Sequence, residues 1–500
     1  MNLSKSRYCK GLQCPKILWM DNNMPEQKAE QDDSRLIIGS MVGTLAKSYF
    51  GEYSEVTFDR MNMSGMIKDT ERLLKAGTGI ITEASFSYDG CFCSIDILKK
   101  VEGGYELIEV KSASGKDDDS EADLNPIYLD DVSYQFYVLT HCGLTIKRTY
   151  LMCLNKEYVR HGELDIKQLF TLTDCTAAVL DRQQDITRNI AAIKAAAAQE
   201  REPDEIIGMR CDTPYECAYK GWCFRSLPEN NVFEIGWRMK RNLKDELYRS
   251  GAVSFEDVMS SGCKLSEKPL RQVMTALRDL PPHIDKRAIR DYLATVKYPL
   301  YHLDFETYQQ AVPLWDDVSP YKPIVFQYSL HIQRECCGVV EHREFLGKEG
   351  IDPRRELAER LCADIPADAC VMAYNKAFEQ TQLRNLAVIF PSMETHLMSI
   401  RDNIVDLMLP FSTGMYYCRE MGRGYSIKRV LPALCGDDPE LDYTKLPLIH
   451  DGGEAMEAYA TLHEQPPKEI AKIRAALLAY CKLDTLAMVK VLEKLYEAME

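Results

Sequence analysis

LYHLDFET, residues 300–307, alternates between apolar and polar side chains. Successive side chains of a β-strand point to opposite faces, so Leu303 and Phe305 are expected on one face and Asp304 and Glu306 on the other. Two carboxylates on one face of a strand can together hold a divalent metal ion. This stretch therefore predicts both a strand of a sheet and the position of a metal site.

The residues after this strand predict its neighbours in the fold. Further strands are expected at 324–331 and 339–345, followed by alternating helices and strands and by a long C-terminal helix over about 468–497. Three antiparallel strands followed by mixed helices and strands is the order expected of a ribonuclease-H-like domain. We therefore place such a domain at 297–500.

Two later segments add acids to the same expected site. CVMAYNKAFEQTQLRNLA reads as a strand running into a helix, which places Glu379 near the helix start. On the C-terminal helix, Asp484 falls on the apolar stripe, four residues after Tyr480 and four before Met488. A carboxylate on a buried face is costly unless it is paired or bound to metal. Tyr480 and Asp484 are one turn apart, so both can reach one site.

Residues 298–500 resemble the DnaQ-like exonucleases in three motifs: an Asp-x-Glu strand, an acid after Asn-x-x-Phe, and Tyr-x-x-x-Asp on a helix. The resemblance implies 3′-to-5′ exonuclease activity, with Tyr480 orienting the attacking water. It implies four ligands for two Mg²⁺ or Mn²⁺ ions, namely Asp304, Glu306, Glu379 and Asp484. Glu379 stands where the family has aspartate. Asp406 is a further candidate, and residues 426–428 are a candidate substrate contact.

A second group of charged residues is expected near residue 100. Residues 84–112 read as strands separated by turns at Asp89-Gly90 and Gly103-Gly104, and helical patterning dominates from about 125 to 200. Glu109 and Lys111 project from one face of a strand, and Asp96 ends the preceding one. A charged pair among apolar neighbours needs a partner or a function.

This arrangement resembles the RecB-like branch of the PD-(D/E)xK nucleases over residues 1 to about 225. The resemblance implies that Asp96 and Glu109 bind a metal ion and that Lys111 activates the attacking water, with Gln135 orienting the lysine or the substrate phosphate. Many members carry a metal-binding histidine on the front helix, but GSMVGTLA has none. Glu83 is the candidate for a further ligand.

Four cysteines form the third group. Cys14 lies near the start of the chain, and Cys211, Cys217 and Cys223 follow about two hundred residues later in a loop. Four thiolates suit a [4Fe–4S] cluster or a structural zinc ion, and the absence of close C-x-x-C pairs favours the cluster. Cys9 is close enough in sequence to Cys14 to be an alternative first ligand.

The cysteine pattern resembles the iron–sulfur nucleases of the RecB-like group, in which one early and three late cysteines close the nuclease domain. Joining distant chain ends removes loop-closure entropy from the unfolded state, which is the physical use of such a cluster. The whole chain also resembles an uncharacterised bacterial family that fuses the two halves, in the stretches PLYHLDFET, YSIKRVLPAL and YCKLDTLAM.

Composition limits the remaining classes of function. The net charge of −15 argues against bulk electrostatic binding to nucleic acid, so local basic patches and metal ions would have to hold phosphate. No run of eighteen apolar residues predicts a membrane helix, and the N-terminus does not read as a secretory signal. We therefore expect a cytoplasmic α/β protein with no membrane partner.

The expected organisation is a nuclease-like domain over 1–228, a helical connector over 229–296 and the ribonuclease-H-like domain over 297–500. The expected function is metal-dependent nuclease activity in DNA repair, recombination or defence, with DNA favoured over RNA as the partner. Two alternatives stay open. One is a nucleic-acid-binding scaffold with one or both sites silent, and the other is a processing factor gated by the redox state of the cluster.

Overall fold

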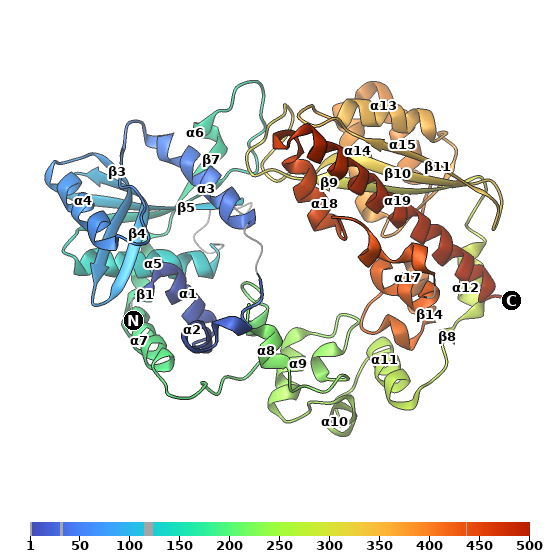
Figure 1. The fold of residues 1–500 in the computed structure, drawn as a ribbon, viewed down its shortest axis with the longest axis horizontal. Helices are drawn as coiled ribbons and strands as arrows, with labels where there is room; N and C mark the ends of the chain where they lie inside the picture. The colour runs from blue at the N-terminus through green and yellow to red at the C-terminus, as the bar shows by residue number, and fades with distance from the viewer. Residues whose placement is uncertain (1–2, 31–33, 115–123, 437) are drawn as a thin grey trace. The chain divides into compact units, whose positions relative to one another are not determined.

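The computed structural model describes residues 3–30, 34–114, 124–436 and 438–500. The chain divides into two compact units, of which the first contains Met1–Leu227 with Ala311–Tyr321 and the second contains Pro228–Gln310 with Lys322–Glu500. Each unit contains a mixed β-sheet with helices packed on it (Figure 1). The predicted α/β class is therefore confirmed.

A seven-stranded sheet is the centre of the first unit. Its strands are β1 (Leu3–Ser4), β2 (Ser54–Glu55), β3 (Ile80–Tyr88), β4 (Cys91–Val101), β5 (Gly104–Ser114), β6 (Ile146–Leu154) and β7 (Phe170–Asp174). Their order is β2-β3-β4-β5-β6-β7, and β1 pairs in parallel with β4. The antiparallel strands β3, β4 and β5 are joined by the predicted turn at Asp89-Gly90 and by a turn ending at Gly103, one residue earlier than predicted.

Helices pack around this sheet. They are α1 (Lys5–Gln13), α2 (Lys16–Asn23), α3 (Ser34–Lys47), α4 (Met63–Lys75), α5 (Pro126–His141), α6 (Ile166–Leu169), α7 (Thr176–Ala197) and α8 (Lys220–Phe224). The prediction of mainly helical structure from 125 to 200 missed β6 and β7. β6 has no regular alternation of apolar and polar residues, and β7 alternates over only five residues, which is too short to define a period.

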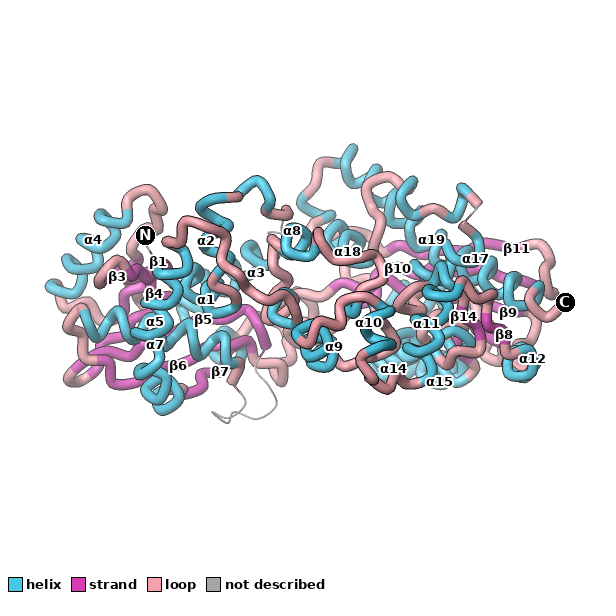
Figure 2. Tube along the Cα trace, turned by 90° about the horizontal axis from the view of Figure 1, so that it is seen from below, coloured by secondary structure: helices cyan, strands magenta, loops and turns pink. Residues whose placement is uncertain are grey.

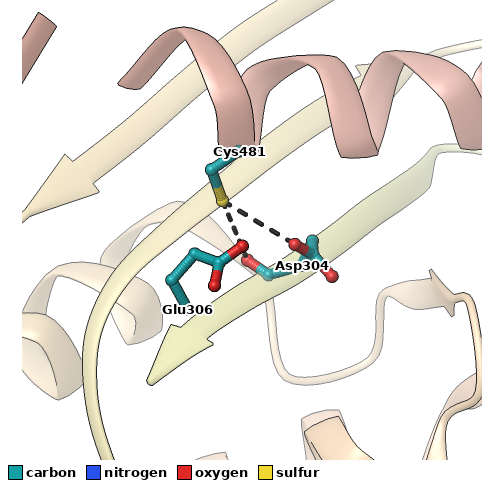
Figure 3. A group of neighbouring side chains, drawn as sticks. All are labelled: Asp304, Glu306 and Cys481. Carbon is teal, nitrogen blue, oxygen red and sulfur yellow. Dashed lines mark hydrogen bonds between the residues drawn. The ribbon is translucent and has the colours of Figure 1, made fainter. Parts of the chain in front are cut away.

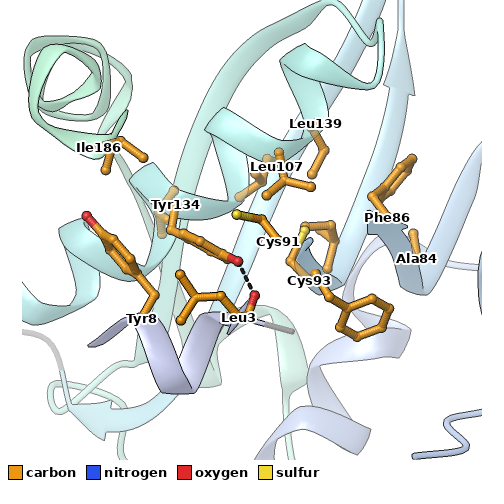
Figure 4. Close-up of a cluster of buried hydrophobic side chains, with 14 of the residues drawn as sticks. Leu3, Tyr8, Ala84, Phe86, Cys91, Cys93, Leu107, Tyr134, Leu139 and Ile186 are labelled. Atoms are coloured by element: carbon orange, nitrogen blue, oxygen red, sulfur yellow. Dashed lines mark hydrogen bonds between the residues drawn. The ribbon is translucent and has the colours of Figure 1, made fainter. Parts of the chain in front are cut away.

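The N-terminal helix is anchored in the core of the first unit (Figure 4). The ring of Tyr8 on α1 stacks on Tyr134 of α5 with 4.7 Å between the ring centres. The Tyr134 hydroxyl donates a hydrogen bond to the backbone oxygen of Leu3. All three residues belong to the main buried cluster of this unit. The start of the chain is therefore held against the same sheet that carries Glu109.

The second unit is built on a five-stranded sheet. Its strands are β9 (Leu300–Tyr308), β10 (Ile324–Gln333), β11 (Val340–Leu346), β12 (Cys370–Ala373) and β13 (Ile404–Asp406). The order is β11-β10-β9-β12-β13, with antiparallel pairing from β11 to β9 and parallel pairing from β9 to β13. The three strands predicted at 300–307, 324–331 and 339–345 are confirmed. A small sheet pairs β8 (His283–Ile284) with β14 (Tyr416–Tyr417).

Helices make up most of the remaining structure of the second unit. They are α9 (Arg241–Arg249), α10 (Phe255–Ser260), α11 (Glu267–Arg278), α12 (Lys286–Leu293), α13 (Arg354–Asp364), α14 (Ala377–Ile389), α15 (Glu394–Asp402), α16 (Leu409–Ser412), α17 (Ile427–Cys435), α18 (Gly452–Ala460) and α19 (Pro467–Glu497). Helices α13, α14 and α15 pack on the apolar side chains of Leu303 and Phe305. Helix α19 crosses β9 and β10 on the opposite face (Figure 2).

The helices α9 to α12 correspond to the segment predicted as a connector. Three of them, α9, α10 and α11, share a small core around Val232, Phe255 and Val273, and all four belong to the second compact unit. Their separation from the C-terminal domain stays a prediction. Within the described ranges, no helix is both long enough and apolar enough to cross a membrane.

Candidate functional sites

Acidic side chains gather where α19 crosses β9. Asp304 and Glu306 point from β9 toward α19, where Cys481 lies above them (Figure 3). One ligand atom from each of the three lies within 4.8 Å of the others, and among the described residues this is the only such group of three or more metal-binding side chains. The alternation of LYHLDFET therefore places both predicted acids on the face that α19 covers.

The other two predicted acids come from helices. Glu379 lies in the first turn of α14, is 2% exposed, and has an Oε2 atom without a hydrogen-bond partner among the described residues. Asp484 lies on α19, where its Oδ1 accepts a hydrogen bond of 2.6 Å from the Tyr443 hydroxyl. Tyr480 also hydrogen-bonds Asp484, as its spacing predicted.

Burial dominates the electrostatics of this acid cluster, which we define as Asp304, Glu306, Glu379 and Asp484. Burial, followed by the charge of Asp484, raises the pKa values of Asp304 and Glu306 well above their usual range. Burial also raises the pKa of Glu379 to about 8 and that of Asp484 to about 6. Without a cation, burial therefore favours the protonated form of Asp304, Glu306 and Glu379 near neutral pH, whereas Asp484 is largely ionised there. A divalent ion would favour the ionised form of all four carboxylates.

Lys428 and Tyr443 lie near these acids and favour the ionised form of Asp484. The Lys428 Nζ lies 5.3 Å and 5.4 Å from the ring centres of Tyr480 and Tyr443, and its charge lowers the pKa of Glu306 and Asp484. Lys428 was predicted as a substrate contact, whereas Tyr443 was missed because it lies in an irregular segment without a periodic pattern. Asp406 accepts hydrogen bonds from backbone nitrogens and raises the pKa of Glu379 by its charge.

In the first unit, Glu109 is the centre of the second cluster. Its buried carboxylate accepts hydrogen bonds from Lys5 Nζ at 2.8 Å, Lys111 Nζ at 2.7 Å and Gln135 Nε2 at 2.7 Å. Asp96 Oδ1 lies 4.0 Å from Lys5 Nζ, and its Oδ2 accepts from the backbone nitrogen of Val110. The four residues predicted here therefore lie together, on β4, β5 and α5.

Lys5 and Asp131 belong to this cluster and were missed from the sequence. Asp131 contacts Lys111 Nζ at 2.5 Å and Gln135 Nε2 at 2.9 Å. Burial lowers the pKa of Lys5 and Lys111, but the nearby carboxylates outweigh it and raise the pKa of both. Asp131 had a signal, since it precedes Gln135 by one helical turn. Lys5 had none, because 104 residues separate it from Glu109.

The candidate further ligand Glu83 has a different partner. It lies on β3 with a positive φ of 55°, which interrupts the regular pairing with β4 between Thr82 and Ala84. Its carboxylate is 3.2 Å from the ammonium group of Lys47 on α3. The front helix, which lacks the expected histidine, therefore supplies a lysine to Glu83.

The four predicted cysteines line one cavity in the first unit. Cys14 follows α1 directly, and Cys211, Cys217 and Cys223 come from the loop and short helix near residue 220. Burial raises the pKa of Cys14 and Cys211, and that of Cys217 to about 11, and each is also raised by the charge of at least one other cysteine of the set. Cys9 does not line this cavity. It packs against the main core instead.

This cavity fits a cationic centre chemically. Four thiols face a common space, and thiolates that repel one another gain most from a shared metal. Lys16, Arg210 and Lys220 also line the cavity, together with one acid, Glu205, which pairs with Arg210. As placed, no three of these four sulfur atoms lie within 4.8 Å of one another, so metal binding would draw them together.

Comparison with known protein families finds one match, which covers part of the chain. Residues 301–426 match the model of a domain of unknown function, DUF2779. The match begins on β9 and contains Asp304, Glu306 and Glu379, but it ends before Tyr480 and Asp484. No curated protein and no solved structure shows significant similarity to the chain.

Proposed function

We propose that the second unit is a metal-dependent nuclease of the DnaQ type that removes nucleotides from DNA 3′ ends. One observation carries this proposal: four carboxylates from β9, α14 and α19 gather in one region, with the pKa values of all four raised by burial and those of Asp304 and Glu306 raised further by the charges of the others. Such a cluster is costly in the absence of a cation, and it is the ligand set that two-metal phosphodiester hydrolysis requires.

The sheet supports the same class. Three antiparallel strands are followed by two parallel ones, in the order β11-β10-β9-β12-β13, with the acids on the central strand β9. This is the order expected of a ribonuclease-H-like domain. The acids of β9 lie under α19, so the long helix contributes its own acid to the same point.

Each residue of the site has a proposed role. Asp304, Glu306, Glu379 and Asp484 would hold Mg²⁺ or Mn²⁺, which supplies positive charge for the attacking and leaving oxygens. Burial, followed by the charges of nearby carboxylates, raises the pKa of Tyr480, so its hydroxyl stays protonated and can position a water molecule. Tyr443 fixes Asp484 through its hydrogen bond. Lys428 provides a positive charge for a phosphate group beside the acids.

We propose a second nuclease site of the PD-(D/E)xK type in the first unit. Asp96 and Glu109 would hold a metal ion there, and Lys111 would act on the attacking water. Gln135 and Asp131 hold Lys111 and Glu109 in position through their hydrogen bonds. The four cysteines would bind a [4Fe–4S] cluster that closes this unit, since Cys14 and the three late cysteines line one cavity.

A binding role without catalysis is the second candidate for the first unit. The observation that favours it is the saturation of Glu109, whose oxygens are occupied by two ammonium groups and one amide. Lys5 provides the positive charge that a metal ion would otherwise bring to Glu109 and Asp96. In that case nucleic acid would bind in the presence of a chelator and would not be cut by this site.

Cleavage of end-labelled substrates tests both proposals. Single-stranded DNA, duplex DNA and single-stranded RNA would be incubated with Mg²⁺ or Mn²⁺ and protein purified without oxygen. We expect Asp304→Ala to reduce the 3′-to-5′ ladder by about 100-fold or more, because it removes a metal ligand. Lys111→Ala should remove a different set of products.

Exposed residues provide the matched controls for these variants. Asp368→Ala and Lys75→Ala change the same residue types at exposed positions and should cut as the wild type does. If the double variant Lys111→Ala, Asp304→Ala still cuts at the wild-type rate, neither site is a nuclease. If only Lys111→Ala is without effect, the binding role is favoured for the first unit.

A further inference from the structure

The acid cluster contains a thiol to which the proposed reaction assigns no role. Cys481 follows Tyr480 on α19 and is completely buried. Its Sγ lies 3.8 Å from Oδ2 and 3.9 Å from the backbone oxygen of Asp304. With Asp304 and Glu306 it forms the group whose ligand atoms lie within 4.8 Å of one another (Figure 3). The sulfur therefore faces the same space as the two carboxylates.

A second observation indicates that this space is meant for a ligand. Oε2 of Glu379 is buried and has no hydrogen-bond partner among the described residues, and the charge of Glu379 raises the pKa of both Asp304 and Glu306. Its charge therefore reaches both of these carboxylates, and one of its own buried oxygens is unsatisfied. A buried acceptor without a partner costs about 1–3 kcal/mol, which a bound cation would remove.

We propose that Cys481 is a ligand of the metal ion held by Asp304 and Glu306, and that its sulfur makes this site favour cations that accept sulfur. Mg²⁺ and Ca²⁺ bind oxygen almost exclusively, whereas Zn²⁺, Cd²⁺ and Co²⁺ accept thiolate. Binding would release the thiol proton to solvent and form a metal–sulfur bond. The inference rests on the acid cluster of the proposed nuclease and adds the identity of the preferred ion.

Competition between two ions of nearly equal size and charge isolates the role of the sulfur. Mn²⁺ bound to the full-length protein would be followed by electron paramagnetic resonance while Cd²⁺ or Ca²⁺ displaces it, with Asp304→Ala as the blank for other Mn²⁺ sites. Free Cd²⁺ would be buffered, because the four-cysteine cavity also takes up this ion. The measured quantity is the ratio of the Ca²⁺ and Cd²⁺ concentrations that displace half of the Mn²⁺.

The expected result is a loss of discrimination in one variant only. Cys481→Ser replaces sulfur by oxygen and should lower the ratio by about tenfold or more. Cys418→Ser alters another buried cysteine of the same unit and should keep the wild-type ratio. A wild-type ratio in Cys481→Ser would overturn the inference, since the cysteine would then be only a packing residue between α19 and β9.

A measurement that requires no change at Cys481 covers the case in which this variant does not fold. Co²⁺ bound by thiolate absorbs in the near ultraviolet through charge transfer. The spectrum of Co²⁺-loaded wild type minus that of Co²⁺-loaded Asp304→Ala should contain this band, and its absence would contradict sulfur ligation.

Parallel cleavage assays separate this inference from the proposed function. Suppose that the wild type cuts DNA, that Asp304→Ala does not, and that Cys481→Ser keeps the wild-type ratio. The proposed nuclease activity is then supported, and sulfur ligation by Cys481 is contradicted. If Cys481→Ser lowers the ratio while the wild type cuts no substrate, the metal site with a sulfur ligand is supported and the proposed nuclease activity is contradicted.

Discussion

Single residues of the acid cluster were predictable where a regular pattern exposed them. Asp304 and Glu306 were found because a strand alternates, and Asp484 because a helix places it on an apolar stripe. Cys481 lies next to Tyr480 in sequence and was not singled out, since a cysteine on a buried helix face is an ordinary core residue. Its place beside Asp304 depends on how α19 crosses β9, and that crossing is a property of packing.

The protonation of Glu379 gives a prediction at this scale. Burial raises its pKa from 4.5 to about 8, so the folded protein binds this proton more tightly than the unfolded chain does. The resulting stabilisation is complete below pH 4.5 and is lost as the pH rises through about 8. In the presence of a chelator, the melting temperature of the wild type should therefore fall between pH 5 and 9.

Glu379→Gln should reduce this fall and raise the melting temperature at pH 8 by several degrees, because the amide carries no charge to bury. Glu394→Gln, an exposed glutamate on α15, is the matched control and should behave as the wild type does. Identical pH profiles for wild type and Glu379→Gln would show that Glu379 ionises normally in the folded protein.

At the scale of elements, long periodic segments were predicted and short ones were not. The strand at 300–307 and the helix at 468–497 carry enough repeats to define their type, and both were confirmed. Strands β6 and β7 were missed in a region predicted as helical, because β6 has no alternation of apolar and polar residues and the alternation of β7 covers only five residues. Helix α1 is also short, with nine residues, and the sequence does not show what its two ends contact.

Helix α1 connects the first proposed site to the four-cysteine cavity. Lys5 at its start contacts Glu109, and Cys14 directly after its end lines the cavity. Gln13 also donates to the backbone oxygens of Arg210 and Tyr215 in the late cysteine loop. Anything bound by the cysteines is therefore positioned to hold the helix that places Lys5.

We predict that Cys14→Ser lowers the cleavage that depends on Lys111 and leaves the cleavage that depends on Asp304 unchanged. Loss of one cysteine should loosen the C-terminal end of α1 and with it the packing of Tyr8 on Tyr134 of α5, the helix that carries Gln135. Product ladders from the two sites, measured with iron content, provide the readout. Cys142→Ser changes an exposed cysteine of the same unit as the control. Equal loss at both sites would contradict a local role for α1.

At the scale of the whole molecule, neither compact unit is formed by one continuous stretch of the sequence. Residues 311–321 follow β9 in sequence, yet they belong to the first unit. Ala311 and Val312 lie in a buried cluster of that unit, and the Tyr321 hydroxyl donates to the backbone oxygen of Ser112. No sequence pattern predicted that these residues belong to the first unit, because an eleven-residue segment between two strands reads as a loop.

Because residues 311–321 belong to the first unit, we predict that a substitution in this segment destabilises the first unit, although the segment lies between two strands of the second. Val312→Asp would bury a carboxylate among apolar side chains, which costs several kcal/mol unless it finds a partner. Hydrogen exchange should then become faster in β4 and β5 of the first unit, while α13 to α15 and their contacts with β9 keep the protection of the wild type. Val339→Asp places the same change at an exposed position of the second unit and should alter neither region. Faster exchange confined to β9 and β10 would mean that residues 311–321 stabilise the second unit, and residues 228–500 could then be studied as a separate domain.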